Sequence, residues 1–350
     1  MRVVVVGATG NVGTSTVRAL VEDPAVDSVV GLARRVPTTR LEGVEWRQAD
    51  VVESDLASHF RGADAVVHLA WLIQPSRDLE TTRAVNVDGS SRVFDAVAAA
   101  EVPALVYASS VGAYSEGPKD RLVDESWPAD GIPSSFYSRH KAEVEQLLTV
   151  FETAHPDVRV VRLRPGLIFK RGASAEIRRY FAGPFLPSAL LRPSLIPIVP
   201  DVPRLRFQAV HSLDVGQAYR LAVTRDVRGA FNIAADPVLD PQELGRLLDA
   251  RPVKMPPGLL RGAAQLSWKL RLQPTPSGWV DMALGVPLMD TSRARKELGW
   301  EPKHTSGEAL LELLGGMRDS AGEDTPPLEP NAGGRFRLKE VLTGVGRTSP

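Results

Sequence analysis

Residues 2–13 read RVVVVGATGNVG, and this stretch decides the fold. The run Val3–Val6 is short and entirely β-branched, which is typical of a strand covered on both faces, as in a parallel sheet. Three glycines follow at three-residue spacing, and Thr14–Val21 then shows the apolar spacing of a helix. The stretch therefore predicts a strand, a tight glycine turn and a helix, which together begin a βαβ unit.

The same alternation continues outward through the first half of the chain. We expect further strands over 28–32, 44–48, 64–70, 104–109 and 158–163, with long helices over 79–100 and 135–154. Strands that alternate with helices at this spacing favour right-handed crossovers and parallel pairing. The fold class predicted is therefore α/β, a Rossmann-type doubly wound parallel sheet.

The glycine turn has the composition that binding a pyrophosphate requires. Among Gly7, Gly10 and Gly13, one allows the tight turn, one lets the backbone approach the phosphates, and one lets the helix pack on the strand. The helix that starts here offers unpaired N–H groups and the positive end of its dipole. Because the glycines lie between a strand and a helix, their context favours a dinucleotide site over a purely structural turn.

The regular alternation of predicted strands and helices ends after Arg164. Six prolines between residues 183 and 203 forbid a regular helix there. We assign residues 1–165 to a dinucleotide-binding domain to which parts of 205–235 return. A smaller, mostly helical substrate domain is expected from 166–204 and 236–318. Residues 319–350 are polar, rich in proline and glycine, and without periodicity, which predicts a disordered tail.

Composition excludes several classes of function. Lys+Arg and Asp+Glu are both 42, so the net charge is zero, which argues against a nucleic-acid or anionic-membrane partner. The absence of cysteine excludes disulfides, zinc–thiolate sites and a cysteine nucleophile, and the six histidines form no HExxH pattern, so no metal is expected. No apolar run approaches 18 residues, so no membrane-spanning helix is expected, and the expected localisation is cytoplasmic.

Tyr137 and Lys141 lie four residues apart at the start of a predicted helix, which places them on one face, one turn apart. A free phenol has a pKa of about 10. A nearby ammonium favours the phenolate and lowers that pKa toward neutrality, which makes the tyrosine an acid or base. With 5 Tyr and 8 Lys in 350 residues, such a pair in this place is improbable by chance.

The GxxGxxG spacing resembles the extended short-chain dehydrogenase/reductase family, in its NAD-dependent epimerase/dehydratase branch. Features in the first half agree: Asp50-Val51 after the third strand, His68-Leu69-Ala70 ending the fourth, Asn86 in a helix, Ser109-Ser110 through Tyr114 after the fifth, and Arg164-Pro165-Gly166 after the sixth. Weaker resemblance continues through 210–215 and 290–300. The resemblance spans residues 1–315 approximately, and its second half is less specific.

The resemblance implies a set of site residues. Tyr137, Lys141, Ser110 and Asn86 take the catalytic positions: Ser110 would bond the substrate oxygen, Lys141 would also hold the nicotinamide ribose, and Asn86 would support the helix and a water. The residues implied to contact the cofactor are Gly7, Thr9, Gly10, Asn11, Val12, Gly13, Asp50, Val51, Leu69, Ala70, Tyr137, Lys141 and Pro165.

The second predicted strand bears on the choice between NAD and NADP. An acid at its end would bond a ribose 2′-hydroxyl, but Ala33 stands there and Arg34-Arg35 follow. Two arginines can neutralise the charge of a 2′-phosphate and form bidentate hydrogen bonds with it. The sequence therefore favours NADP, with NAD as the alternative. If the two arginines are merely solvated, they have no role in cofactor binding.

The reaction expected is hydride transfer between a nicotinamide and a carbinol or carbonyl carbon. Val111-Gly112 stands where dehydratases of this branch carry an Asp-Glu pair, which argues against dehydration. A nucleotide-sugar epimerase and a non-catalytic NAD(P)-sensing protein are the alternatives. The family also forms homodimers through the helices expected at 79–100 and 135–154, so a homodimer is expected by analogy alone.

The substrate is expected to be a small, apolar molecule. Apolar residues between 183 and 203, with Trp268 and Trp279, would line its pocket. A nucleotide sugar instead demands arginine or lysine forks for its diphosphate. Five arginines of the second part could meet phosphates: Arg178, Arg179, Arg192, Arg204 and Arg206.

Overall fold

The computed structural model describes residues 1–38, 41–185, 196–330 and 345. A seven-stranded parallel sheet lies at its centre, in the order β11-β7-β5-β4-β1-β2-β3. In chain order its strands are β1 (Arg2–Val6), β2 (Ser28–Ala33), β3 (Val44–Gln48), β4 (Ala65–His68), β5 (Ala104–Ala108), β7 (Arg159–Pro165) and β11 (Gly229–Ile233). The prediction of a doubly wound parallel sheet is confirmed.

Both faces of the sheet are covered by helices, because successive side chains of each strand point to opposite faces. Val3 and Val5 pack with α1 (Asn11–Val21) and α7 (Ser212–Thr224). Val4 and Val6 pack with the helices of the other face, which are α2 (Leu56–Phe60), α4 (Gly89–Ala99) and α5 (Phe136–Ala154). All four valines are almost completely buried, which explains why the run is uniformly apolar.

The helix predicted over 79–100 consists of three segments. α3 (Leu79–Arg83) passes into a π-helical turn (Ala84–Asp88), which passes into α4. The turn contains Asn86, whose side-chain amide bonds the backbone N–H and C=O of Leu72 at 2.7 and 2.8 Å. The Ser90 hydroxyl also donates to the Asn86 carbonyl at 2.6 Å. The widened turn therefore joins the helix to the chain that follows β4, and π-turns of this kind are frequent at functional sites.

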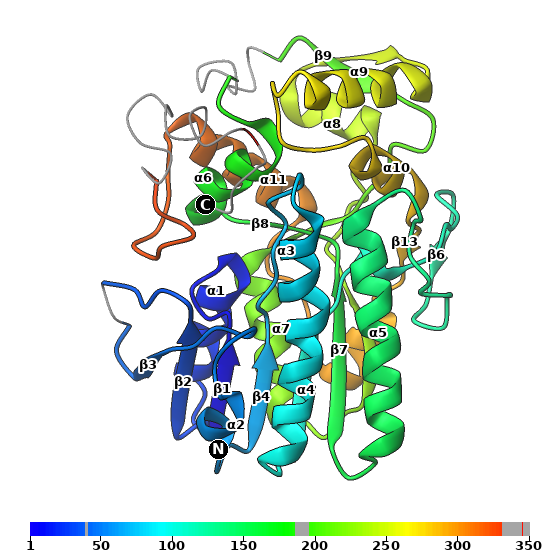
Figure 1. Ribbon diagram of the computed structural model, residues 1–350. Coiled ribbons are helices and arrows are strands. Elements are labelled where there is room, and N and C mark those ends of the chain that lie inside the picture. Colours follow the sequence, from blue (N-terminus) through cyan, green and yellow to red (C-terminus); the bar gives the residue numbers. More distant parts are fainter. Residues whose placement is uncertain (39–40, 186–195, 331–344, 346–350) are drawn as a thin grey trace.

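The second part of the chain lies over the carboxyl ends of the central strands (Figure 1). It contains two-stranded parallel sheets, β8 (Leu167–Phe169) with β10 (Ala209–His211) and β9 (Ile198–Asp201) with β12 (Arg251–Lys254). β6 (Leu122–Val123) pairs with β13 (Leu288–Met289). The helices are α6 (Ser174–Ile177), α8 (Pro241–Leu248), α9 (Pro257–Lys269), α10 (Gly278–Gly285) and α11 (Ser306–Arg318). Shorter helical turns occupy Val111–Ala113, Arg171–Ala173, Arg178–Ala182 and Ala294–Leu298.

Of the segment 205–235, parts of which are expected to return to the first domain, β11 joins the central sheet beside β7, whereas β10 pairs with β8 in a separate sheet. Arg204 has a positive φ of 70°, and the Leu205 N–H bonds the Val202 carbonyl, so the chain turns there instead of extending. The domain boundaries at residues 165, 204 and 235 stay a prediction.

Residues 319–330 pack against the body of the protein, which differs from the expected disordered tail. Glu323 pairs with Lys170 at 2.8 Å, and Leu328 is fully buried. The Thr325 hydroxyl donates to the Thr9 carbonyl at 2.8 Å. These contacts give a polar, aperiodic segment a fixed position without regular structure. Apart from Val345, the rest of the expected tail lies outside the described residues.

Within the described ranges, no helix is both long and apolar enough to cross a membrane. The same ranges contain no group of three or more His, Asp or Glu side chains placed to share a metal ion.

Candidate active site

The glycine turn connects β1 to α1 and leaves open space at the helix N-terminus. A Cβ on Gly7, whose φ is 85°, would lie 2.6 Å from the backbone nitrogen of Ala70, and one on Gly13 would lie 2.3 Å from the Gly7 carbonyl. A Cβ on Gly10 would meet nothing closer than the Gly7 carbonyl at 3.7 Å, and no side chain caps α1. The turn therefore presents backbone N–H groups to a clear space, which fits a pyrophosphate.

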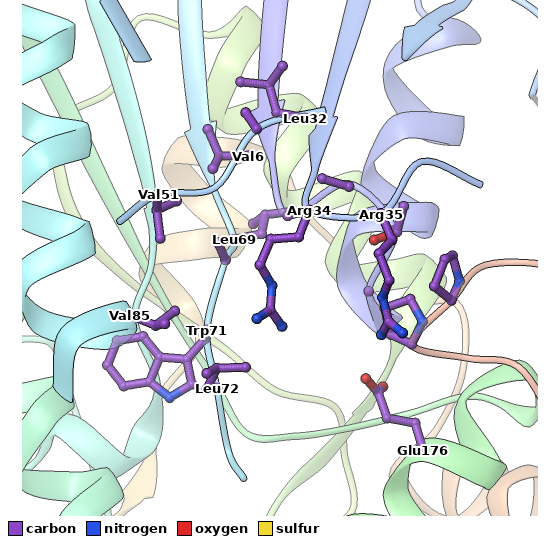
Figure 2. Close-up of a pocket in the computed structure, with 18 of the residues that line it drawn as sticks. Val6, Leu32, Arg34, Arg35, Val51, Leu69, Trp71, Leu72, Val85 and Glu176 are labelled. Carbon is purple, nitrogen blue, oxygen red and sulfur yellow. The ribbon is translucent and has the colours of Figure 1, made fainter. Parts of the chain in front are cut away.

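A groove runs from this turn across the carboxyl ends of the strands (Figure 2). We call it the glycine-loop groove. The predicted residues that line it are Gly7, Thr9, Gly10, Arg34, Arg35, Val51, Leu69 and Ala70. Trp71, Leu72 and Val85 continue one wall, Glu176 and Tyr180 form the opposite side, and Pro326 and Pro327 contribute from the segment 319–330.

Several of the predicted residues do not line this groove. The Asn11 side chain bonds the Ile168 carbonyl at 3.2 Å, and Val12 packs against the core. The Asp50 carboxylate accepts from the Val52 N–H at 2.8 Å, so it shapes the loop that presents Val51. Asn86 holds Leu72, and Pro165 ends β7 beside Ile233. Because none of these residues lines the groove, their contact with a cofactor stays a prediction.

Charged groups of opposite sign face each other across the groove. Arg34 and Arg35 extend into it from the end of β2, and Glu176 points toward Arg35 from α6 (Figure 2). Burial raises the pKa of the Glu176 carboxyl to about 7, against a hydrogen bond from Tyr180. This end of the groove thus contains two cations and one acid that titrates near neutrality. Sequence reasoning missed Glu176, because its segment carried no motif.

Tyr137, Lys141 and Ser110 come together where β5 ends and α5 begins. Ser110 caps a short turn by accepting the Gly112 N–H at 3.0 Å, and a hydrogen bond joins Ser110 to the Tyr137 phenol. A Cβ on Gly112 would lie 2.8 Å from the Tyr137 ring, so only glycine allows this contact. The Lys141 ammonium, one turn along α5, donates to the Ala108 carbonyl at 2.6 Å. The structure therefore places the three predicted side chains around one point.

Aromatic rings enclose this point. The Tyr137 ring lies 4.9 Å from the Trp279 ring and 5.9 Å from the Trp71 ring, measured between centroids. The Lys141 ammonium lies 3.4 Å from the Trp71 ring centroid, a cation–π contact. Trp71 immediately follows the predicted His68-Leu69-Ala70 segment, so its position in the sequence was the available signal for it.

The titration of the pair differs from the sequence expectation. Burial raises the pKa of the Tyr137 phenol to about 12, and the hydrogen bond with Ser110 opposes that rise. Burial also lowers the pKa of Lys141 well below its ordinary value, while Glu145 opposes this change. The ammonium is directed to the Ala108 carbonyl and Trp71, 5.9 Å from the centre of the tyrosine ring. Tyr137 is therefore a protonated phenol at neutral pH in this arrangement.

A buried anion supports the lysine from the next turn of α5. Glu145 is 3% exposed and accepts from Arg164 at 2.8 and 2.9 Å and from Arg162 at 3.1 Å. Burial alone would raise the pKa of the Glu145 carboxyl, but the hydrogen bonds and charges of the two arginines outweigh it and lower the pKa to about 2. Glu145 therefore stays charged at neutral pH.

A cavity of about 430 Å³ lies beside side chains that pack on Tyr137, and we call it the apolar cavity. Trp279, Met282 and Val111 line it and also pack against Tyr137. Its other walls come from 166–181, 205–208 and α10, with Phe181, Phe207 and Leu284 among the lining side chains. The expected lining from 183–203 is corrected: Phe185 and Ile198 are exposed, and 186–195 lie outside the described residues. Trp268 instead packs on Arg77.

The chain belongs to the NAD dependent epimerase/dehydratase family, whose model matches residues 3–234. An uncharacterized protein of Mycobacterium tuberculosis is 26% identical over 330 residues, which cover 90% of this chain and 83% of that protein. L-arabinose 1-dehydrogenase (NAD(P)(+)) of Haloferax volcanii is 31% identical over 176 residues, 47% of this chain and 66% of the relative. Sterol-4-alpha-carboxylate 3-dehydrogenase, decarboxylating, of Saccharomyces cerevisiae is 26% identical over 181 residues, 49% of this chain and 52% of the relative.

Among solved structures, UDP-glucose 4-epimerase of Thermotoga maritima with UDP-glucose superposes with a TM-score of 0.68. The identity is 20%, and the match covers 91% of this chain and 99% of that one. At this identity the likeness shows the shared fold alone.

Proposed function

We propose that the protein is an NAD(P)-dependent oxidoreductase that interconverts a carbonyl and a carbinol on a small, apolar substrate. The observation that carries the proposal is the position of Tyr137. Its ring contacts both Trp71, which lines the glycine-loop groove, and Trp279, which lines the apolar cavity. A phenol between a dinucleotide site and an apolar site can deliver a proton where the two ligands meet.

The residues present suit the reduction of a carbonyl group. A nicotinamide in the groove would supply the hydride to the carbonyl carbon. Tyr137, protonated at neutral pH, gives its proton to the carbonyl oxygen, so one hydride and one proton convert the carbonyl to an alcohol. The Ser110 hydroxyl bonds Tyr137 and can bond the same oxygen. Lys141 offers positive charge beside the phenol as its proton leaves, and Trp71 and Trp279 keep water away.

The backbone of the groove determines where the cofactor lies, and its charges bear on which cofactor it is. Arg34 and Arg35 favour a 2′-phosphate and hence NADP. Glu176 opposes them once it ionises, because it lies across the groove from Arg35. We therefore propose NADP as the preferred cofactor, with NAD as the alternative.

The arginines of the second part argue against a nucleotide-sugar substrate. Arg204 donates to the carbonyls of Leu284 and Gly117, Arg206 donates to the Lys119 carbonyl, and Arg179 donates to the Glu329 carbonyl. These guanidinium groups are committed to backbone oxygens instead of facing the apolar cavity. Arg178 is also buried and has an interaction, and Arg192 lies outside the described residues.

The test is oxidation of NADPH and NADH, followed at 340 nm, with alicyclic and aromatic ketones and with UDP- and dTDP-sugars. We expect turnover of a ketone and none of the nucleotide sugars, and Tyr137→Phe serves as the inactive control. Interconversion of a UDP-sugar without net cofactor oxidation would establish the epimerase instead. Tight cofactor binding without turnover of any carbonyl compound would favour a sensing protein. The homodimer expected by analogy stays a prediction, which sedimentation velocity checks.

A further inference from the structure

The apolar cavity contains a buried cation that the proposed reaction does not use. Among the described residues that line it, Lys119 and Gln208 carry the charged or amide groups. The Gln208 amide donates to the Met289 carbonyl at 3.0 Å and accepts from the Met289 N–H at 2.7 Å. Gln208 is therefore bound to the backbone of β13, and Lys119 is the charged group among the described lining residues that could anchor a ligand.

Lys119 is 6% exposed, and its ammonium is only partly satisfied by the protein. Its Nζ donates to the Arg206 carbonyl at 2.8 Å and to the Ala283 carbonyl at 2.9 Å. An ammonium has three N–H donors, so these two bonds leave one for another acceptor. The charge itself has no ion-pair partner among the described residues.

The charged groups around Lys119 add to this imbalance. Arg204 approaches the same loop and pairs with Glu116 at 3.4 Å, and Arg206 directs its guanidinium to the Lys119 carbonyl at 3.2 Å. Burial, and then the charge of Arg204, lower the pKa of the Lys119 ammonium to about 7. A buried cation without an anion is unfavourable. A negatively charged group in the cavity would therefore accept a hydrogen bond from Lys119 and neutralise its charge.

The backbone holds Lys119 in place. Gly117 donates its N–H to the Gly285 carbonyl at 3.0 Å, and the Pro118 carbonyl accepts from Leu288 at 3.3 Å. A Cβ on Gly117 would lie 2.6 Å from Pro287, so the loop lies close against the end of α10. The ammonium is thus fixed at the wall of the cavity before any ligand arrives, which lowers the entropy cost of binding.

We propose that Lys119 anchors a carboxylate, so that the substrate of the apolar cavity is an apolar molecule bearing one carboxylate group. The carboxylate accepts the third N–H and supplies the missing negative charge, while Phe181, Phe207 and Leu284 cover the rest of the molecule. A diphosphate carries more charge than one ammonium can balance. This inference rests on the proposed function in one respect, namely that the apolar cavity is the substrate site.

The experiment compares two ligands with the same apolar skeleton, 4-pentylcyclohexanecarboxylate and its neutral carboxamide. Each is titrated against the full-length protein saturated with NADP, and binding is read from displacement of the fluorescent probe N-phenyl-1-naphthylamine. At pH 7 we expect the carboxylate to bind at least about 10-fold more tightly than the carboxamide. This is the affinity ratio that one charge-assisted hydrogen bond provides. In Lys119→Met this preference should disappear, while the carboxamide binds within about 3-fold of its wild-type affinity.

A second measurement needs no variant. Raising the pH from 7 to 9 deprotonates Lys119 in the empty cavity. Carboxylate affinity should fall as Lys119 loses its proton, and the total loss should be about 10-fold, which is the contribution of the charge-assisted bond. Carboxamide affinity should stay level.

Lys254→Met, at an exposed lysine of β12, is the matched control for Lys119→Met and should keep the wild-type preference for the carboxylate.

Three results would overturn the proposal. These are equal affinity of wild type for the two ligands, equal loss of both in Lys119→Met, and no displacement of the probe by either ligand. The proposed function fails separately, because it is judged by oxidation of NADPH with neutral ketones. A carboxylate preference without any redox activity would leave Lys119 as an anchor and reject the oxidoreductase.

Discussion

Replacing Glu145 by Gln should destabilise the protein by about 3 kcal/mol at pH 7. The carboxyl is 3% exposed, and its pKa is about 2 against an ordinary 4.5. That pKa difference corresponds to about 3 kcal/mol. The figure agrees with the roughly 3–5 kcal/mol expected when a buried ion pair loses one partner, because Arg162 and Arg164 would remain charged and buried.

The loss depends on pH in a direction that the structure fixes. A carboxyl whose pKa is lowered by folding adds stability that is complete above its unfolded pKa and is lost as the pH falls through the folded pKa. The stability difference between wild type and Glu145→Gln should therefore be constant from pH 7 to 5. Between pH 4.5 and 2 it should shrink, by about 1.4 kcal/mol per pH unit.

Urea denaturation followed by tryptophan fluorescence, at several pH values, measures both quantities. Glu143→Gln is the matched control, because Glu143 lies on the same helix and pairs with Arg83 at 2.6 Å, where both side chains are more than a third exposed. Its loss should cost at most about 1 kcal/mol. A destabilisation by Glu145→Gln below about 1 kcal/mol, or a difference that stays level down to pH 3, would refute the reasoning.

Three further predictions concern the groove and its neighbours. Tyr137→Phe should lower turnover by roughly 10²–10⁴-fold with little change in cofactor affinity measured by fluorescence titration, and unchanged turnover would remove Tyr137 from the mechanism. Changing Arg34 and Arg35 together to Ala should weaken NADP by about 1.5–3 kcal/mol per lost charge-assisted bond and barely affect NAD, as calorimetry can check; equal effects on the two cofactors would contradict the 2′-phosphate assignment. Ending the chain after Arg318 leaves Lys170 buried without Glu323, so the melting temperature should drop by several degrees, and an unchanged value would show that the packing of 319–330 adds nothing.

The sequence predicted those parts of the fold and site that depend on local patterns. Val3–Val6 specified a strand buried on both faces, and the glycines after it specified the turn. Both features depend only on residues that are neighbours in the sequence. Tyr137 and Lys141 were predictable for the same reason, since helical spacing alone places them one turn apart.

Features that depend on distant contacts were not predictable from the sequence. Glu176 reaches the groove only because α6 lies over the carboxyl ends of the strands. Lys119 is buried by carbonyls of residues 206 and 283, and no local signal brings these segments together. The raised pKa of Tyr137 also follows from burial against Trp279, which the spacing of Tyr137 and Lys141 does not contain.

The hydrogen bond between Thr325 and Thr9 joins residues 316 positions apart and has a consequence for biosynthesis. The ribosome makes the glycine turn long before it reaches Thr325, and domains generally fold as units during synthesis. The prolines at 326 and 327 that border the groove emerge only after all the strands of the central sheet have been made. A nascent chain stalled before them therefore has the turn and the parallel strands but an open groove mouth. Its affinity for the dinucleotide should change when translation passes residue 327.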